Sequence, residues 1–169
     1  IGISSNKPVS ANIINSLKKL EYRGYDSAGI ATLSDGYINE VKSEGRVENL
    51  EKNFDLKVLS GNIGIGHVRW ATHGVPNSVN AHPHSSDNVS VVHNGIIENS
   101  TLLKKHLINQ GHKFKSQTDT EVIVHLITEN LKSFELQEAI TKTLKQLHGS
   151  FALGVIFKDK PDLIVGARR

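Results

Sequence analysis

The sequence predicts an α+β fold, in which helices and antiparallel strands form separate layers. Apolar strand-like runs come in pairs joined by short turns, and Asp35-Gly36 between two such runs is a strong hairpin signal. Amphipathic helical patterns, in contrast, follow one another directly between residues 100 and 147. A strict alternation of strand and helix, which would indicate a parallel sheet, does not occur.

The first half of the chain should contain two hairpin strands and two longer central strands. A strand tail at 1–3 precedes a helix that opens near Pro8 and Ser10. The apolar face of this helix is expected to hold Ile13, Ile14, Leu17 and Leu20. Strands are then expected at 28–33, 37–41, 63–69 and 89–93, with a short helix at 47–54.

The second half should contain three helices and a final strand pair. Ser100 is the expected N-cap of a helix with an apolar stripe of Leu102, Leu103, Leu107 and Ile108. Thr118 to Glu121 have the spacing of a capping box, opening a helix that buries Val122, Ile123, Leu126 and Ile127. A third helix is expected at 136–147, followed by strands at 150–157 and 163–167.

Composition places the chain among soluble globular domains. Its 169 residues are 22% charged and 37% hydrophobic, enough for one domain with a real core. No apolar run approaches the ~20 residues of a membrane span, and no secretory signal peptide is visible. The net charge of +3 comes from scattered basic residues interleaved with acids, which argues against a nucleic-acid partner. The chain contains no cysteine, which excludes disulfide and zinc–thiolate scaffolds.

Two charged residues stand where a ligand could be held. Arg69 ends a predicted strand just before a glycine-terminated turn, where a guanidinium can clamp a carboxylate through two parallel hydrogen bonds. An ordinary ion pair is the alternative. Asp119 lies at a predicted helix start, where it could cap the helix or bind the ammonium group of a ligand.

Asn94 and Gly95 form a third candidate site. A side-chain amide and a glycine N–H after a strand can together hold a developing oxyanion, although an ordinary Asn-Gly turn is the alternative. Combined with Arg69 and Asp119, they describe a pocket for an amino acid and acyl transfer at its side chain. A nucleophile is missing from this set.

The histidines allow a different hypothesis, a metal-dependent hydrolase that uses His82, His84 and His93. Two alternating histidines can bind zinc, but hydrolytic zinc sites usually need a third ligand and a carboxylate base. His82 and His84 flank a proline in a loop, and no H-E-x-x-H helix exists. Hydrogen bonding by these histidines is therefore the favoured interpretation, with no metal.

Five motifs, in this order, resemble the glutaminase domains of the class II glutamine amidotransferases. Their sequences are most similar to those of the glucosamine-6-phosphate synthase family. They are EYRGYDSAG at 21–29, RWATHG at 69–74, NAHPH at 80–84, HNGIIEN at 93–99 and TDTEV at 118–122. The resemblance spans essentially the whole chain. It implies a four-layer αββα sandwich of the N-terminal nucleophile hydrolase type, with residues 1–169 as one glutaminase domain that is truncated at both ends.

The resemblance also implies a mechanism without cofactor or metal. An N-terminal cysteine attacks the side-chain amide of glutamine, and its own α-amino group serves as the base. By position, Asn94 and Gly95 would form the oxyanion hole, while the substrate would be bound by Arg69, Trp70, Thr72, His73, His82 and Asp119. Arg23 and Asp26 would support the N-terminal corner of the site.

In the family, Cys-Gly-Ile directly precedes the position of Ile1, and the printed chain has no cysteine at all. We therefore expect the printed chain to be inactive by itself. The resemblance implies L-glutamine and L-glutamate as ligands, and fructose 6-phosphate as acceptor of the ammonia in sugar isomerase domains that are absent here. It further implies a cytoplasmic protein that is a homodimer at full length. A non-catalytic glutamine- or glutamate-binding module is the principal alternative.

Overall fold

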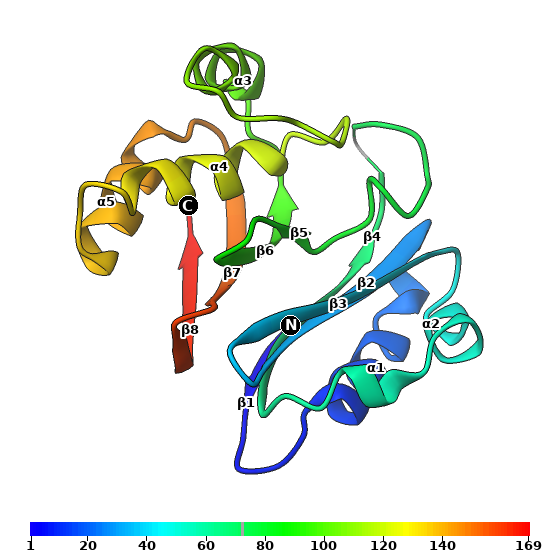
Figure 1. The fold of residues 1–169 in the computed structure, drawn as a ribbon. Helices are drawn as coiled ribbons and strands as arrows, with labels where there is room; N and C mark the ends of the chain where they lie inside the picture. Colours follow the sequence, from blue (N-terminus) through cyan, green and yellow to red (C-terminus); the bar gives the residue numbers. More distant parts are fainter. Residues whose placement is uncertain (72) are drawn as a thin grey trace.

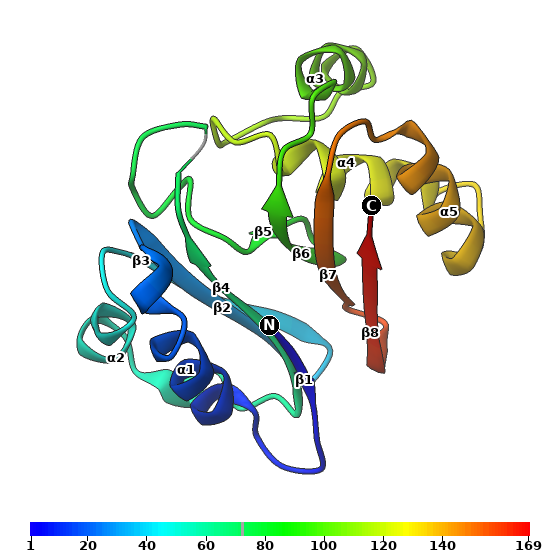
Figure 2. The same cartoon turned by 180° about the vertical axis from the view of Figure 1, so that it is seen from behind.

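A computed structural model describes residues 1–71 and 73–169. Two four-stranded antiparallel sheets lie face to face (Figures 1 and 2). The first has the order β1 (Gly2–Ser4), β4 (Ile63–Arg69), β2 (Ser27–Ser34) and β3 (Tyr37–Glu44). The second has the order β5 (His84–Ser85), β6 (Val89–Gly95), β7 (Phe151–Phe157) and β8 (Lys160–Arg168).

Helices cover both outer faces, which confirms the predicted four-layer sandwich. The outer face of the first sheet carries α1 (Ser10–Lys18) and α2 (Glu48–Asn53). On the second sheet lie α4 (Glu121–Asn130) and α5 (Leu136–Gln146), while α3 (Ser100–Asn109) sits beyond the end of β6 (Figure 1). Short 3-10 turns occur at Glu21–Arg23 and Leu56–Val58. No helix within the described residues has the length and apolarity needed to cross a membrane.

Three apolar clusters hold the layers together, because successive side chains of a strand point to opposite faces. Ala28 and Ile30 of β2 pack toward α1, whereas Ala31 and Leu33 face the second sheet. This explains why residues 28–31 of β2 form an apolar run rather than an alternating pattern. Full burial of each large aliphatic side chain contributes about 1.5–3 kcal/mol.

Some local predictions were wrong. Glu121 does not close a capping box, because its carboxylate accepts hydrogen bonds from the backbone N–H groups of Lys115 and Ser116. Ser100 is the first residue of α3 and not its N-cap. Leu102 is 70% exposed and Ile108 is 49% exposed, so the buried face of α3 is narrower than predicted.

Candidate active site

A cavity of about 670 Å³ opens where β4 and β6 end beside the start of α4. Its lining includes eight of the predicted site residues, namely Arg23, Arg69, Trp70, His73, His82, Asn94, Gly95 and Asp119. Asp26 stands behind this lining and contacts Arg69. The prediction for Thr72 falls outside the described residues.

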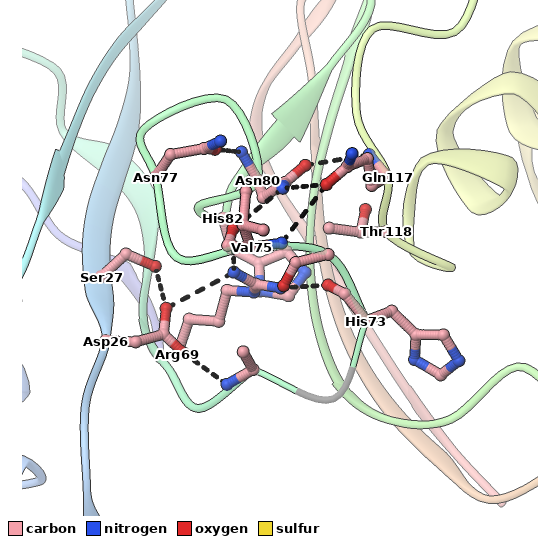
Figure 3. Close-up of polar contacts among 12 residues, drawn as sticks. Asp26, Ser27, Arg69, His73, Val75, Asn77, Asn80, His82, Gln117 and Thr118 are labelled. Carbon is pink, nitrogen blue, oxygen red and sulfur yellow. Dashed lines mark hydrogen bonds and ion pairs between the residues drawn. The ribbon is translucent and has the colours of Figure 1, made fainter.

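Arg69 is buried at the end of β4 and organises the loop that follows. Its guanidinium donates to the Asp26 carboxylate at 3.4 Å and to the backbone carbonyls of His73, Gly74 and Val75 (Figure 3). Because these contacts occupy both terminal nitrogens, a ligand carboxylate that accepts two parallel hydrogen bonds from Arg69 must replace at least one of them.

The loop after Arg69 is also tied to the segment that precedes α4. Asn80 donates to the Val75 carbonyl at 2.9 Å and accepts from the backbone N–H of Gln117 at 2.9 Å (Figure 3). Gln117 in turn accepts from the Val75 N–H at 3.3 Å. The loop and the α4 segment are thus bound to each other, and His73 and Thr118 from these two segments line the cavity.

Asp119 is not a helix cap. It lies before the first residue of α4, is 6% exposed, and accepts a hydrogen bond from the Ile97 N–H through Oδ2 at 2.7 Å. Its second oxygen, Oδ1, lies 4.0 Å from Nδ1 of His73. This buried carboxylate can therefore present one oxygen to a cation in the cavity.

Asn94 and Gly95 end β6 at the cavity. Gly95 has φ of +133°, and a Cβ there would lie 2.1 Å from the Ser150 carbonyl oxygen, so the position requires glycine. The N–H of Ile96 bonds to Ser150. Since hydrogen-bonded pairs alternate along antiparallel strands, the N–H of Gly95 points away from β7. The Asn94 side chain makes no hydrogen bond with any described residue, so both donors can serve an oxyanion.

Trp70 lies at the rim, where its indole is 70% exposed. Its six-membered ring packs on Gly24, where an added Cβ would lie 2.4 Å from Cε3. The indole thus packs on Gly24, the first of the two glycines in the motif at 21–29.

His82 is buried and uses both ring nitrogens inside the protein. Nδ1 lies 3.0 Å from Nδ1 of His67, and Nε2 lies 2.8 Å from the hydroxyl of Thr120. The same hydroxyl lies 2.9 Å from Nδ1 of His93. His82 therefore has no free nitrogen to offer a ligand and supports the cavity floor instead.

The metal hypothesis finds little support in this geometry. His84 is bonded to the Thr118 hydroxyl at 3.0 Å, and His82 and His93 share Thr120. No group of three or more metal-ligating side chains is arranged around a common point in the part of the chain that the structure describes. Each of the three histidines is hydrogen-bonded to a threonine hydroxyl, which is the interpretation that the sequence favoured.

Burial keeps these imidazoles neutral. It lowers the pKa of His67 and of His84 to about 3, with Lys42 adding to the effect on His84. Burial also lowers the pKa of His82 well below its ordinary value. In an unfolded chain, histidines titrate near pH 6.5. Between about pH 3 and pH 6.5 the unfolded chain therefore binds more protons than the folded one.

We therefore expect the free energy of unfolding to fall as the pH falls from about 6.5 towards 3. Each such histidine contributes a slope of about 1.4 kcal/mol per pH unit. His84→Gln should flatten this dependence, because glutamine keeps a polar group but does not titrate. Urea unfolding across this pH range measures the slope. His106→Gln, at an exposed position of α3, is the matched control. An unchanged slope in His84→Gln would contradict the assignment.

Comparison with known proteins decides the family. The glutamine amidotransferase domain family matches residues 67–169, which is more than half of the chain. The chain belongs to this family. Curated relatives of this glutamine amidotransferase domain carry the name glutamine–fructose-6-phosphate aminotransferase (isomerizing). The protein from Mesorhizobium japonicum is 53% identical over 169 residues, covering 99% of this chain and 28% of the relative. That from Pyrococcus horikoshii is 51% identical, covering 100% and 29%.

Solved structures of other amidotransferases share the fold. The glutamine phosphoribosylpyrophosphate amidotransferase from B. subtilis superposes with a TM-score of 0.81 at 31% identity, over 93% of this chain and 34% of that one. A class II glutamine aminotransferase domain protein from Silicibacter pomeroyi, at 16% identity and a TM-score of 0.58, covers 85% and 68% and supports the fold alone.

The sequence missed the supporting residues of this amidotransferase domain. His67 and Thr120 were not identified from the sequence, because each bonds to partners 15 or more positions away in the chain. Thr118 was interpreted as the first residue of a capping box, although its hydroxyl bonds to His84. The available signal was the second threonine of the TDTEV motif, since this motif also contains Asp119.

Proposed function

We propose that the cavity binds L-glutamine and that this domain hydrolyses the side-chain amide to L-glutamate and ammonia. One observation carries the proposal. A buried guanidinium, a buried carboxylate and two oxyanion donors from three separate parts of the chain line a single cavity. These are the groups that a glutamine molecule requires at its α-carboxylate, its α-ammonium and its reacting amide.

Each group of glutamine has a candidate partner. The α-ammonium would bind Asp119, whose Oδ1 remains after Oδ2 is taken by Ile97. The α-carboxylate would bind Arg69, with His73 beside it, and the resemblance assigns Thr72 to substrate binding as well. The amide oxygen would gain negative charge between the Asn94 side chain and the Gly95 N–H, and Trp70 would close the rim.

The register of β1 supports a nucleophile ahead of Ile1. Gly2 pairs with Ile65, and Ile1 exchanges both backbone hydrogen bonds with Gly66. If the antiparallel pairing continues, the third residue before Ile1 lies opposite Arg69 at the cavity. The cysteine of a preceding Cys-Gly-Ile would occupy that position.

The reaction then follows from this placement. The sulfur attacks the amide carbon, the α-amino group passes the thiol proton to the leaving nitrogen, and ammonia departs to leave a thioester. Water hydrolyses the thioester and returns the proton to the sulfur. We call the printed sequence with Cys-Gly-Ile ahead of Ile1 the cysteine-bearing chain.

The chain spans about 28% of the length of its curated relatives. We propose that the whole protein transfers the ammonia to fructose 6-phosphate, as the relatives' name indicates. The resemblance to the synthase family implies that the product is glucosamine 6-phosphate. Sugar isomerase domains outside this chain would bind that substrate. By the same resemblance, the whole protein would be a cytoplasmic homodimer.

One observation favours a second function. The printed sequence has no cysteine, and without one the same cavity would serve as a non-catalytic module that binds glutamine or glutamate. Both functions require the ligand to bind, and only the first requires hydrolysis.

We expect L-glutamate to bind the printed chain and to change the fluorescence of Trp70, its only tryptophan. The indole sits at the cavity rim, so a bound ligand alters its surroundings. Fluorescence titration alongside calorimetry makes the measurement, with Trp70→Phe as the variant that should lose the signal. An absence of heat and of fluorescence change with both L-glutamate and L-glutamine would refute the ligand assignment.

A further inference from the structure

A chain of buried hydrogen bonds runs under the cavity and joins the two sheets. It consists of His67 on β4, His82 before β5, Thr120 before α4 and His93 on β6, and we call it the imidazole–hydroxyl chain. All four residues also line the cavity. Its three contacts measure 3.0, 2.8 and 2.9 Å.

Thr120 is the junction of this chain. Its residue is 1% exposed, and its hydroxyl has only His82 and His93 as partners among the described residues. A hydroxyl has one proton to donate and two sites that accept. Since it has no third partner among the described residues, it donates its proton to one ring and accepts from the other. Burial lowers the pKa of both histidines, which keeps the two rings neutral.

The shared hydroxyl couples the tautomers of the rings. It faces Nε2 of His82 and Nδ1 of His93. If it accepts from His82, it donates to Nδ1 of His93, and both rings carry their proton on Nε2. If the direction reverses, both rings carry it on Nδ1. His67, which meets His82 through Nδ1 of each ring, takes the opposite tautomer.

The junction lies between the two halves of the candidate site. His93 directly precedes Asn94, the proposed oxyanion donor, and Thr120 directly follows Asp119, the proposed ammonium acceptor. A second bond, from the Ile97 N–H to Asp119 at 2.7 Å, joins the same two segments. The end of β6 and the start of α4 are therefore fixed to each other at two points.

We propose that Thr120 is a positioning residue for glutamine hydrolysis, whose hydroxyl sets the spacing between Asn94 and Asp119 by bonding to both His82 and His93. The inference rests on the proposed function, since it concerns the same cavity. Thr120 acts through His93 and through its own backbone. A glutamine molecule held at both ends is sensitive to this spacing, because a misplacement of about 1 Å can cost about 10²-fold in rate.

Two variants of the complete natural protein, Thr120→Val and Thr120→Ser, separate the effect of the hydroxyl from the effect of side-chain volume. Valine keeps the shape of threonine and removes the hydroxyl, whereas serine keeps the hydroxyl and removes a methyl group. We expect Thr120→Val to lower kcat/KM for glutamine hydrolysis by about 10²-fold, and Thr120→Ser to stay near wild type. Equal losses in the two variants, or wild-type kcat/KM in Thr120→Val, would overturn the inference.

Nitrogen NMR of the unmodified protein gives a readout that does not depend on a variant folding. The imidazole shifts of His82 and His93 should report the same tautomer, and that of His67 the opposite one. Different tautomers for His82 and His93 would also overturn the inference. Failure of the proposed function has another signature, namely a wild-type protein that neither binds nor hydrolyses glutamine.

Discussion

Replacing Asn94 by alanine in the cysteine-bearing chain is expected to lower kcat for glutamine hydrolysis by about 10²–10³-fold. The Asn94 side chain lies in the cavity and makes no hydrogen bond with any described residue, so its amide is available to a ligand. The oxygen of the reacting amide gains full negative charge only as the thiol adds. The loss should therefore appear in kcat, with KM changed little. Steady-state release of ammonia measures both constants.

Asn99→Ala is the matched control for that variant. Asn99 belongs to the same motif, but its amide donates to the Gln146 carbonyl and accepts from the His148 N–H, which joins the start of α3 to the end of α5. This variant should lose stability and keep kcat. A near-normal kcat in Asn94→Ala, or an equal loss in Asn99→Ala, would contradict the oxyanion role.

Replacing Arg69 by alanine is expected to raise the KM for glutamine and the Kd for glutamate by roughly 10–100-fold, since a charge-assisted hydrogen bond contributes about 1.5–3 kcal/mol. Arg69 is 3% exposed and lines the cavity, and Asp26 balances its charge. Calorimetry with glutamate separates binding from the chemical step.

Arg69 also holds the loop carbonyls of residues 73–75, so its loss should reduce stability as well. The ligand provides the control for this second effect. Glutaminamide lacks the α-carboxylate, so wild type should prefer glutamine over it, and Arg69→Ala should lose that preference. A preference that survives in Arg69→Ala would assign the carboxylate to another residue.

The sequence was sufficient for the layers and for the positions of the main site residues. The central strands β4, β6 and β7 are largely apolar, and the hairpin at Asp35-Gly36 forms as predicted, with Ser34 paired to Tyr37. Arg69, Asn94 and Gly95 could be found because each lies at the end of a strand, just before a loop. The sheet topology then brings these two strand ends together.

The sequence was insufficient where a side chain has a tertiary partner. Glu121 has the spacing of a capping box, but its carboxylate satisfies the N–H groups of Lys115 and Ser116, and Asp119 reaches back to Ile97. The local sequence pattern could not reveal these bonds, because each bond uses a carboxylate that could equally have capped the helix. The partners of His82, at positions 67 and 120, lie 15 and 38 positions away in the chain.

The most direct test of glutamine hydrolysis in this cavity compares the cysteine-bearing chain with the same chain that begins Ser-Gly-Ile. Release of glutamate and ammonia from L-glutamine is measured for both, with glutamate binding as the check that each is folded. We expect hydrolysis from the cysteine-bearing chain and essentially none from the serine variant. Glutamate binding without hydrolysis in either chain would contradict the amidotransferase assignment for this cavity and would leave a binding module.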